Sequence, residues 1–218
     1  MYSNKLQITI AIMVAMLVAT PANAQNWVEK RRDRQEISDG QMDLEATRAE
    51  LQRLRETVAR ARASNPASAA DLATMEMIMS AQAANTQASA GQADREVRQS
   101  SRELRGDRRE FRRNKDNDVS GYEKFRDRRN RRDDRRDRAN DRDDAVALDQ
   151  LSADQSQTLA RFRSATSDAE KINHAIAFAS LMEQRIVLTR EELAEDKTEL
   201  REDRRETRDD RRERFFRD

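Results

Sequence analysis

The sequence predicts an all-α protein made of long antiparallel helical hairpins in tandem duplication. The hairpins are expected to form a four-helix bundle or coiled coil with one highly charged half. Only four Gly and two Pro occur in 218 residues, so little interrupts a helix. Apolar residues recur every seven positions, and the first half of the chain is echoed in the second.

The echoes define the domain organisation. The segment SRELRGDRREFRRN, which begins at Ser101, returns as KTELREDRRETRDD at Lys197, an offset of 96 residues. NWVEKRRDR returns as SGYEKFRDR, and TVARARAS returns as TLARFRSA. A repeated unit of this kind is typical of helical repeat architectures. We therefore expect hairpin 1 over residues 25–116 and hairpin 2 over residues 117–218, both packing as one bundle.

The seven-residue period runs through all but one of the expected helices. A sustained period of seven is typical of a coiled-coil seam rather than of a globular helix face. The residues that carry it are Ile37, Leu44, Leu51 and Val58; Val97, Leu104 and Phe111; and Ile172, Ala179, Ile186, Leu193 and Leu200.

Helix starts are marked by capping pairs, in which a Ser or Asn is followed three residues later by an acid. Two pairs begin the hairpins, and two begin the second helix of each hairpin. The pairs are Asn26 with Glu29, Ser68 with Asp71, Ser120 with Glu123, and Ser167 with Glu170. The helices expected from them cover residues 27–63, 68–115, 121–164 and 168–217.

Two places in these helices look weak. Gly40 and the run 143–155 are expected to kink or break their helices, since a helical Gly costs about 1 kcal/mol against Ala. The run from Ala81 to Ala93 has no large side chain, which would allow another helix to approach closely.

The first 24 residues have the pattern of a secretory signal peptide. Lys5 precedes an apolar run, Leu6 to Ala19, and small residues follow up to Ala24. The apolar run is shorter than a bilayer span requires. We expect cleavage before Gln25, export to the periplasm or beyond the cell, and no stable membrane span afterwards.

Composition excludes several functional classes. The chain has 43 basic and 42 acidic residues, and the signal segment holds one Lys, so the mature chain is neutral. This pattern argues against a nucleic-acid partner, because proteins that bind nucleic acid show an uncompensated basic face. With one His, His174, and no Cys, the groups used for nucleophilic catalysis are scarce. We expect no enzyme and no resident cofactor.

One loop resembles an EF-hand calcium site. DNDVSGYEKFRD, from Asp116 to Asp127, places oxygen-bearing residues at the ligand positions of such a loop, with Gly121 at the turn. A plain capped turn explains the same residues. The ligands of the calcium hypothesis are Asp116, Asp118, Ser120, Tyr122 and Asp127.

Aromatic residues gather where the hairpins are open, at the end opposite the turns near Ser64 and Ala165. We call the end with these turns the closed end. If the hairpins lie side by side, the aromatics converge and form an interface. They are Trp27, Phe111, Tyr122, Phe125, Phe215 and Phe216.

A short motif suggests a family. Leu151-Ser152-Ala153-Asp154-Gln155 resembles the Leu-Thr-x-x-Gln motif of the periplasmic Spy/CpxP chaperones, and Leu188 to Glu192 is a second, poorer copy. The resemblance implies an exported, cofactor-free helical cradle for unfolding proteins. The methionines at 75, 77 and 79 would then supply an adaptable binding surface.

Three functions remain open. The first is an exported, cofactor-free coiled-coil protein of the cell envelope that acts by binding or spacing, through a protein partner or self-association. The alternatives are a Spy/CpxP-like chaperone or stress adaptor, and a calcium-modulated binding protein. An accessible apolar groove near the closed end favours the chaperone, whereas a filled core with self-association favours the structural role.

Overall fold

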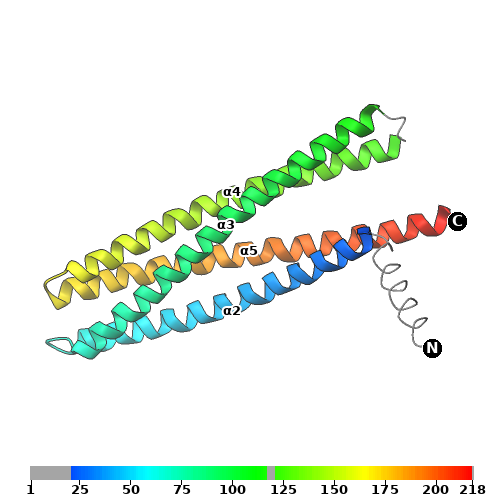
Figure 1. The fold of residues 1–218 in the computed structure, drawn as a ribbon. Helices are drawn as coiled ribbons and strands as arrows, with labels where there is room; N and C mark the ends of the chain where they lie inside the picture. The colour runs from blue at the N-terminus through cyan, green and yellow to red at the C-terminus, as the bar shows by residue number, and fades with distance from the viewer. Residues whose placement is uncertain (1–20, 117–120, 218) are drawn as a thin grey trace, which may run out of the picture. The chain divides into compact units, whose positions relative to one another are not determined.

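The computed structural model describes residues 21–116 and 121–217 (Figure 1). Over this part of the chain the protein is all-α, with no strand, and forms a four-helix bundle, as predicted. Three helices begin and end within one residue of the expected positions. The helices are α2 (Pro21–Ala63), α3 (Ala69–Asp116), α4 (Gly121–Ser164) and α5 (Asp168–Arg217).

The start of α2 differs from the prediction. The helix begins at Pro21, so Asn26 lies inside it and the predicted Asn26–Glu29 cap is wrong. Proline suits a first helical turn, because its missing N–H would have no intrahelical partner there. The equivalent cap at Ser120 lies outside the described residues.

The caps of α3 and α5 are confirmed. The Asp71 N–H donates to Ser68 Oγ at 3.0 Å, and the Ser68 hydroxyl donates back to the Asp71 carboxylate at 2.7 Å. The Glu170 N–H donates to Ser167 Oγ, and the Ser167 N–H donates to Glu170, both at 3.3 Å. These bonds from Ser68 and Ser167 lower the pKa of the two carboxyl groups.

The chain divides into two compact units. The smaller contains α2 up to Met42 and α5 from Leu193 onward. Here α2 runs through Gly40 without the predicted break. A Cβ added at Gly40 would lie 2.9 Å from Leu193 Cδ2, so the glycine allows Leu193 to pack directly against the α2 backbone. This contact accounts for a residue that otherwise disfavours a helix.

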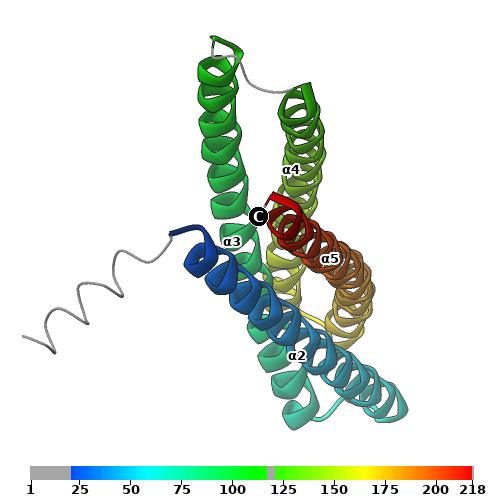
Figure 2. The same cartoon turned by 90° about the vertical axis from the view of Figure 1, so that its right-hand side faces the viewer.

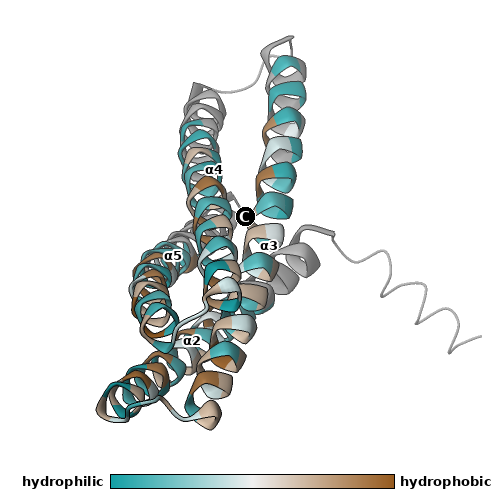
Figure 3. Cartoon of the chain, turned by 90° about the vertical axis from the view of Figure 1, so that its left-hand side faces the viewer, coloured by the Kyte–Doolittle hydropathy of each residue, from teal (hydrophilic) through white to brown (hydrophobic). Residues whose placement is uncertain are grey.

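The larger unit, residues 43–192, has its main core near the closed end. All four helices contribute, as expected if each turns one apolar stripe inward. In Figure 3 hydrophobic positions gather toward these ends of the helices. The closed-end cluster contains Leu51, Leu54, Val58, Ala61, Met75, Ile78, Met79, Ala83, Leu159, Phe162, Ile172, Ala175, Phe178, Ala179, Met182 and Ile186.

A second, smaller core lies farther along the same unit. This alanine cluster consists of Ala90, Ala93, Ala145 and Leu148. The backbones of α3 and α4 approach to Cα–Cα distances within 8 Å, and Figure 2 shows the two helices side by side. The close approach expected from the small residues is therefore confirmed. The break predicted over 143–155 is wrong, because Ala145, Leu148 and the residues after them pack into the bundle.

Candidate functional site

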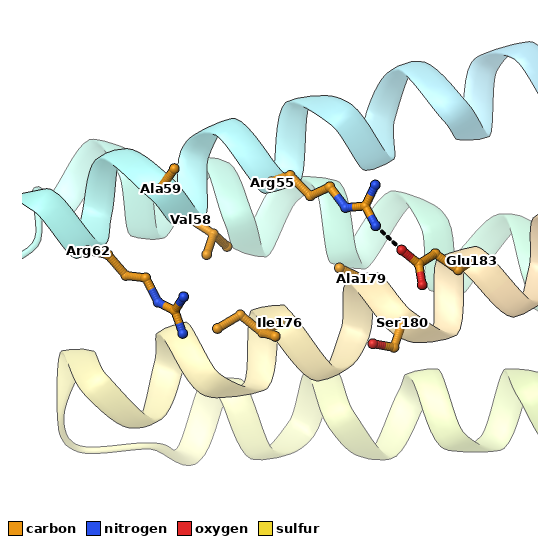
Figure 4. Close-up of a pocket in the computed structure, with 8 residues that line it drawn as sticks. All are labelled: Arg55, Val58, Ala59, Arg62, Ile176, Ala179, Ser180 and Glu183. Atoms are coloured by element: carbon orange, nitrogen blue, oxygen red, sulfur yellow. Dashed lines mark hydrogen bonds and ion pairs between the residues drawn. The ribbon is translucent and has the colours of Figure 1, made fainter.

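A surface groove lies between α2 and α5, close to the closed end. Its volume is about 470 Å³, within the range of ligand pockets. Figure 4 shows α2 on one side and α5 on the other. The residues that line it are Arg55, Val58, Ala59, Arg62, Ile176, Ala179, Ser180 and Glu183.

The floor of the groove is the outer edge of the closed-end cluster. Val58 and Ala179 are members of that cluster, and Ile176 packs against it while remaining partly exposed. Ala59 and Ser180 stand beside them and are exposed. Because these two side chains are small, α2 and α5 leave an apolar channel here rather than a closed seam.

The rim of the groove is charged. Arg55 of α2 forms an ion pair with Glu183 of α5, and both side chains are about half exposed, at 53% and 49%. A pair this exposed contributes at most about 1 kcal/mol. Arg62 lies on the same helix face one heptad later, and no described carboxylate pairs with it. The groove therefore has an apolar floor and, as far as the described residues go, one cation without a paired carboxylate.

The predicted aromatic interface cannot be placed. All six residues fall in helices, but their side chains lie outside the described part of the structure. Trp27, Phe215 and Phe216 belong to the smaller unit, and the others belong to the larger one. The interface stays a prediction.

The calcium loop is shorter than the motif suggests. Asp116 is the last residue of α3, while Tyr122 and Asp127 lie within α4. Asp118 and Ser120 are outside the described residues. Among the residues that are described, no group of three or more His, Asp or Glu side chains gathers as a metal site. Calcium binding stays a prediction.

The motif that resembles the Spy/CpxP family has its two end residues buried, while Ala153 between them is exposed. Leu151 is 3% exposed and Gln155 is fully buried in the middle of α4, and Thr189 of the second copy is also buried. The predicted methionine surface is wrong, since Met75 and Met79 are fully buried and only Met77, 57% exposed, faces solvent. Methionines at this helical spacing fill the core instead.

His174, the single histidine, is partly buried near the start of α5. Its charge contributes in a minor way to the lowered pKa of Glu170. Across the residues placed by the structure, no helix carries an apolar stretch sufficient to cross a membrane.

Sequence reasoning missed the groove. The seven-residue period predicts Val58 as a seam residue, but it does not single out Arg55 or Arg62. The sequence does contain a pattern that could have indicated the groove. Arg55 and Arg62 are seven residues apart and flank Val58 and Ala59, so a cation lies on each side of one apolar turn of the helix. Comparison with protein-family models, curated proteins and solved structures finds no match.

Proposed function

We propose that this is an exported, cofactor-free helical protein of the cell envelope that acts by binding a protein partner. The groove between α2 and α5 is the binding site in this proposal, and catalysis has no part in it. Export rests on the signal-like segment 1–24, and binding rests on the groove. The observation that carries the proposal is an open apolar channel at the bundle surface, with an arginine at its edge that pairs with no carboxylate among the described residues.

The partner segment that fits is short, amphipathic and acidic. Its apolar side chains would cover Val58 and Ile176, which removes apolar surface from water at about 25 cal/mol per Å². A carboxylate on the segment would pair with Arg62, the cation without a partner in the groove. A basic segment would meet Arg55 and Arg62 with like charge, so charge sets the preference.

A pair of labelled peptides tests this proposal. One carries alternating leucine and glutamate, and the other has lysine in place of glutamate. Fluorescence anisotropy with the full chain should show binding of the acidic peptide and at least tenfold weaker binding of the basic one. Arg62→Glu should reverse this order, while Ser180→Trp, which fills the groove, should abolish both.

The chain offers a matched control. Arg161 is an exposed arginine in the last turn of α4 and does not line the groove. Arg161→Glu makes the same charge change as Arg62→Glu and should leave both affinities unchanged. Equal binding of the two peptides to the wild-type chain would contradict the proposal.

The chaperone alternative uses the same groove but takes unfolded partners. The feature that favours it is the position of the groove at the closed end, where apolar residues are concentrated. A chaperone of this kind should suppress aggregation of a chemically unfolded model protein without ATP, and Ser180→Trp should remove that effect. If the acidic peptide binds but aggregation is unchanged, the protein recognises folded or short partners only.

A further inference from the structure

A layer of polar side chains separates the two apolar clusters of the larger unit. On α3, Thr86 is buried between Ala83 of the closed-end cluster and Ala90 of the alanine cluster. Gln82, also buried, directly precedes Ala83. Each of the other three helices adds buried polar residues at this level. The buried members are Thr47, Gln82, Thr86, Gln155, Arg185 and Thr189.

Arg185 of α5 organises this layer. Its side chain is only 2% exposed, and it reaches two other helices. The guanidinium donates to the Asp43 carboxylate of α2 at 2.7 Å, and to the hydroxyls of Thr86 at 2.6 Å and Ser89 at 3.0 Å on α3. One cation of hairpin 2 therefore has three acceptors, all of them supplied by hairpin 1.

The layer is not built for maximum stability. A buried ion pair often contributes no more than apolar side chains of the same volume. Arg185 Nε, Gln82 Oε1 and both amide atoms of Gln155 find no hydrogen-bond partner among the described residues. Polar groups retained at such cost in helical bundles can determine which helices pair and in which register.

The two hairpins bury equivalent positions, so each could accept a copy of itself. From Met79 onward, inward positions of α3 recur in α5 at an offset of 96 residues, and several inward positions of α2 recur in α4 at an offset of 101. In α3 and α5 the matched positions are 79 with 175, 82 with 178, 83 with 179, 86 with 182, 89 with 185, 90 with 186 and 93 with 189. In α2 and α4 they are 43 with 144, 47 with 148, 54 with 155, 58 with 159 and 61 with 162.

The charged residues break this equivalence. Ser89 holds in hairpin 1 the place that Arg185 holds in hairpin 2, and Asp144 holds the place of Asp43. By this correspondence of positions, the counterpart of the arginine that pairs with Asp43 is, for Asp144, a serine. Burial raises the pKa of Asp144, and the nearby charges of Asp141, Glu191 and Asp143 raise it further.

Pairing a hairpin with its own copy would therefore satisfy the layer poorly. Two copies of hairpin 1 would leave each Asp43 opposite a Ser89, with no cation between them. Two copies of hairpin 2 would bring two Arg185 side chains together, with Asp144 in the place of Asp43 but with Met182 in the place of the Thr86 hydroxyl. Only hairpin 1 with hairpin 2 combines one guanidinium with a carboxylate and both hydroxyls.

We propose that the buried polar layer determines pairing: it makes hairpin 2 the matched partner of hairpin 1 and disfavours pairing of either hairpin with a second copy of itself. The determinant is the placement of one arginine at position 185 and a serine at position 89. It follows that exchanging the two residues, Ser89→Arg together with Arg185→Ser, should destabilise the protein less than the two single substitutions would if their effects added.

An arginine exchange in the full chain tests this. Ser89→Arg and Arg185→Ser should each lower the urea unfolding midpoint, the first through two opposed guanidinium groups and the second through an unpaired Asp43. In the double variant the unfolding midpoint should fall by clearly less than the sum of the two single decreases, because the guanidinium at position 89 would then face Asp144. NMR titration should show the pKa of Asp144 falling from its raised value. Additive losses with an unchanged Asp144 pKa would overturn the proposal.

Arg185→Met provides a second readout, which does not depend on lost stability. It removes the charge but keeps an apolar side chain of similar length; because Asp43 loses its partner, as in Arg185→Ser, the unfolding midpoint should fall, and the readout is the dimer fraction. The same variant should form a larger fraction of dimers than wild type in sedimentation equilibrium, because two copies of hairpin 2 no longer repel. Arg161→Met, an exposed change on α4, should not alter the dimer fraction. An Arg185→Met chain with the wild-type dimer fraction would also overturn the proposal.

Discussion

The closed-end cluster and the alanine cluster belong to the same unit but are built differently. The closed-end cluster fills its interior with large side chains, including the fully buried Leu54, Phe178 and Met182. The alanine cluster has one large buried member, Leu148, and brings the α3 and α4 backbones close together instead. Buried apolar area per residue is therefore much greater at the closed end.

This difference indicates how stability is distributed along the bundle. Hydrophobic stabilisation follows the apolar area removed from water, so the closed end should unfold last. Close backbone approach adds many weak dispersion contacts but buries little apolar area. Beyond Leu148, toward the connection of α3 and α4, Leu104 is a buried apolar residue among mostly exposed charged ones. The polar layer marks the boundary between the two regimes.

The largest effect should come from emptying the closed end. Phe178 is fully buried, so Phe178→Ala should cost about 3–5 kcal/mol in the free energy of unfolding. Leu148→Ala in the alanine cluster should cost about 2 kcal/mol, since helices packed on small side chains lose less contact area. Urea unfolding followed by circular dichroism measures both. Val187→Ala, at a position 48% exposed, is the control and should change little. Equal losses at Phe178 and Leu148 would contradict the stability gradient.

A smaller effect is expected from the caps, which lie at the closed end. Ser68→Ala removes the hydroxyl that accepts the Asp71 N–H and should cost about 1 kcal/mol. Ser167→Ala at the equivalent cap of α5 should give a similar loss. The pKa of Asp71 is lowered from 3.8. The ionised carboxylate therefore stabilises the fold above pH 3.8, and this stabilisation is lost as pH falls through the lowered pKa. The cost of Ser68→Ala should therefore shrink in acid, and a cost independent of pH would contradict the cap.

The smallest effect is expected beside the alanine cluster. The pKa of Asp144 in the folded protein is raised above 3.8. The protonated side chain therefore contributes favourably to the free energy of unfolding below pH 3.8, and this contribution is lost as pH rises through the folded pKa. Asp144→Asn should raise the free energy of unfolding at neutral pH, by less than about 1 kcal/mol after solvent screening. The gain should disappear in acid. Asp149→Asn, at an exposed position on the same helix, should show no such pH dependence.

The sequence predicted the helices well, because the signals for them are local. Ser68 with Asp71 and Ser167 with Glu170 specify helix starts through bonds within one turn. The seven-residue period correctly placed Leu51, Ile172 and Leu200 on the inside. The errors at Gly40 and at 143–155 share one cause. Intrinsic preference indicated a break, but contact with Leu193 and burial of Leu148 outweighed a cost of about 1 kcal/mol.

By itself, the sequence determined the fold class, the length of the helices and the ends of three of them, because capping and periodicity depend on neighbours a few residues apart. Only the tertiary structure showed that Arg55 and Glu183 face each other across a groove, and that Arg185 lies between Asp43, Thr86 and Ser89. The two residues of each pair are more than 90 positions apart, and nothing local distinguishes Arg55 and Arg185 from the other arginines of the chain. Which charge is buried depends on how the faces of four helices meet, and that is fixed by packing rather than by any single helix.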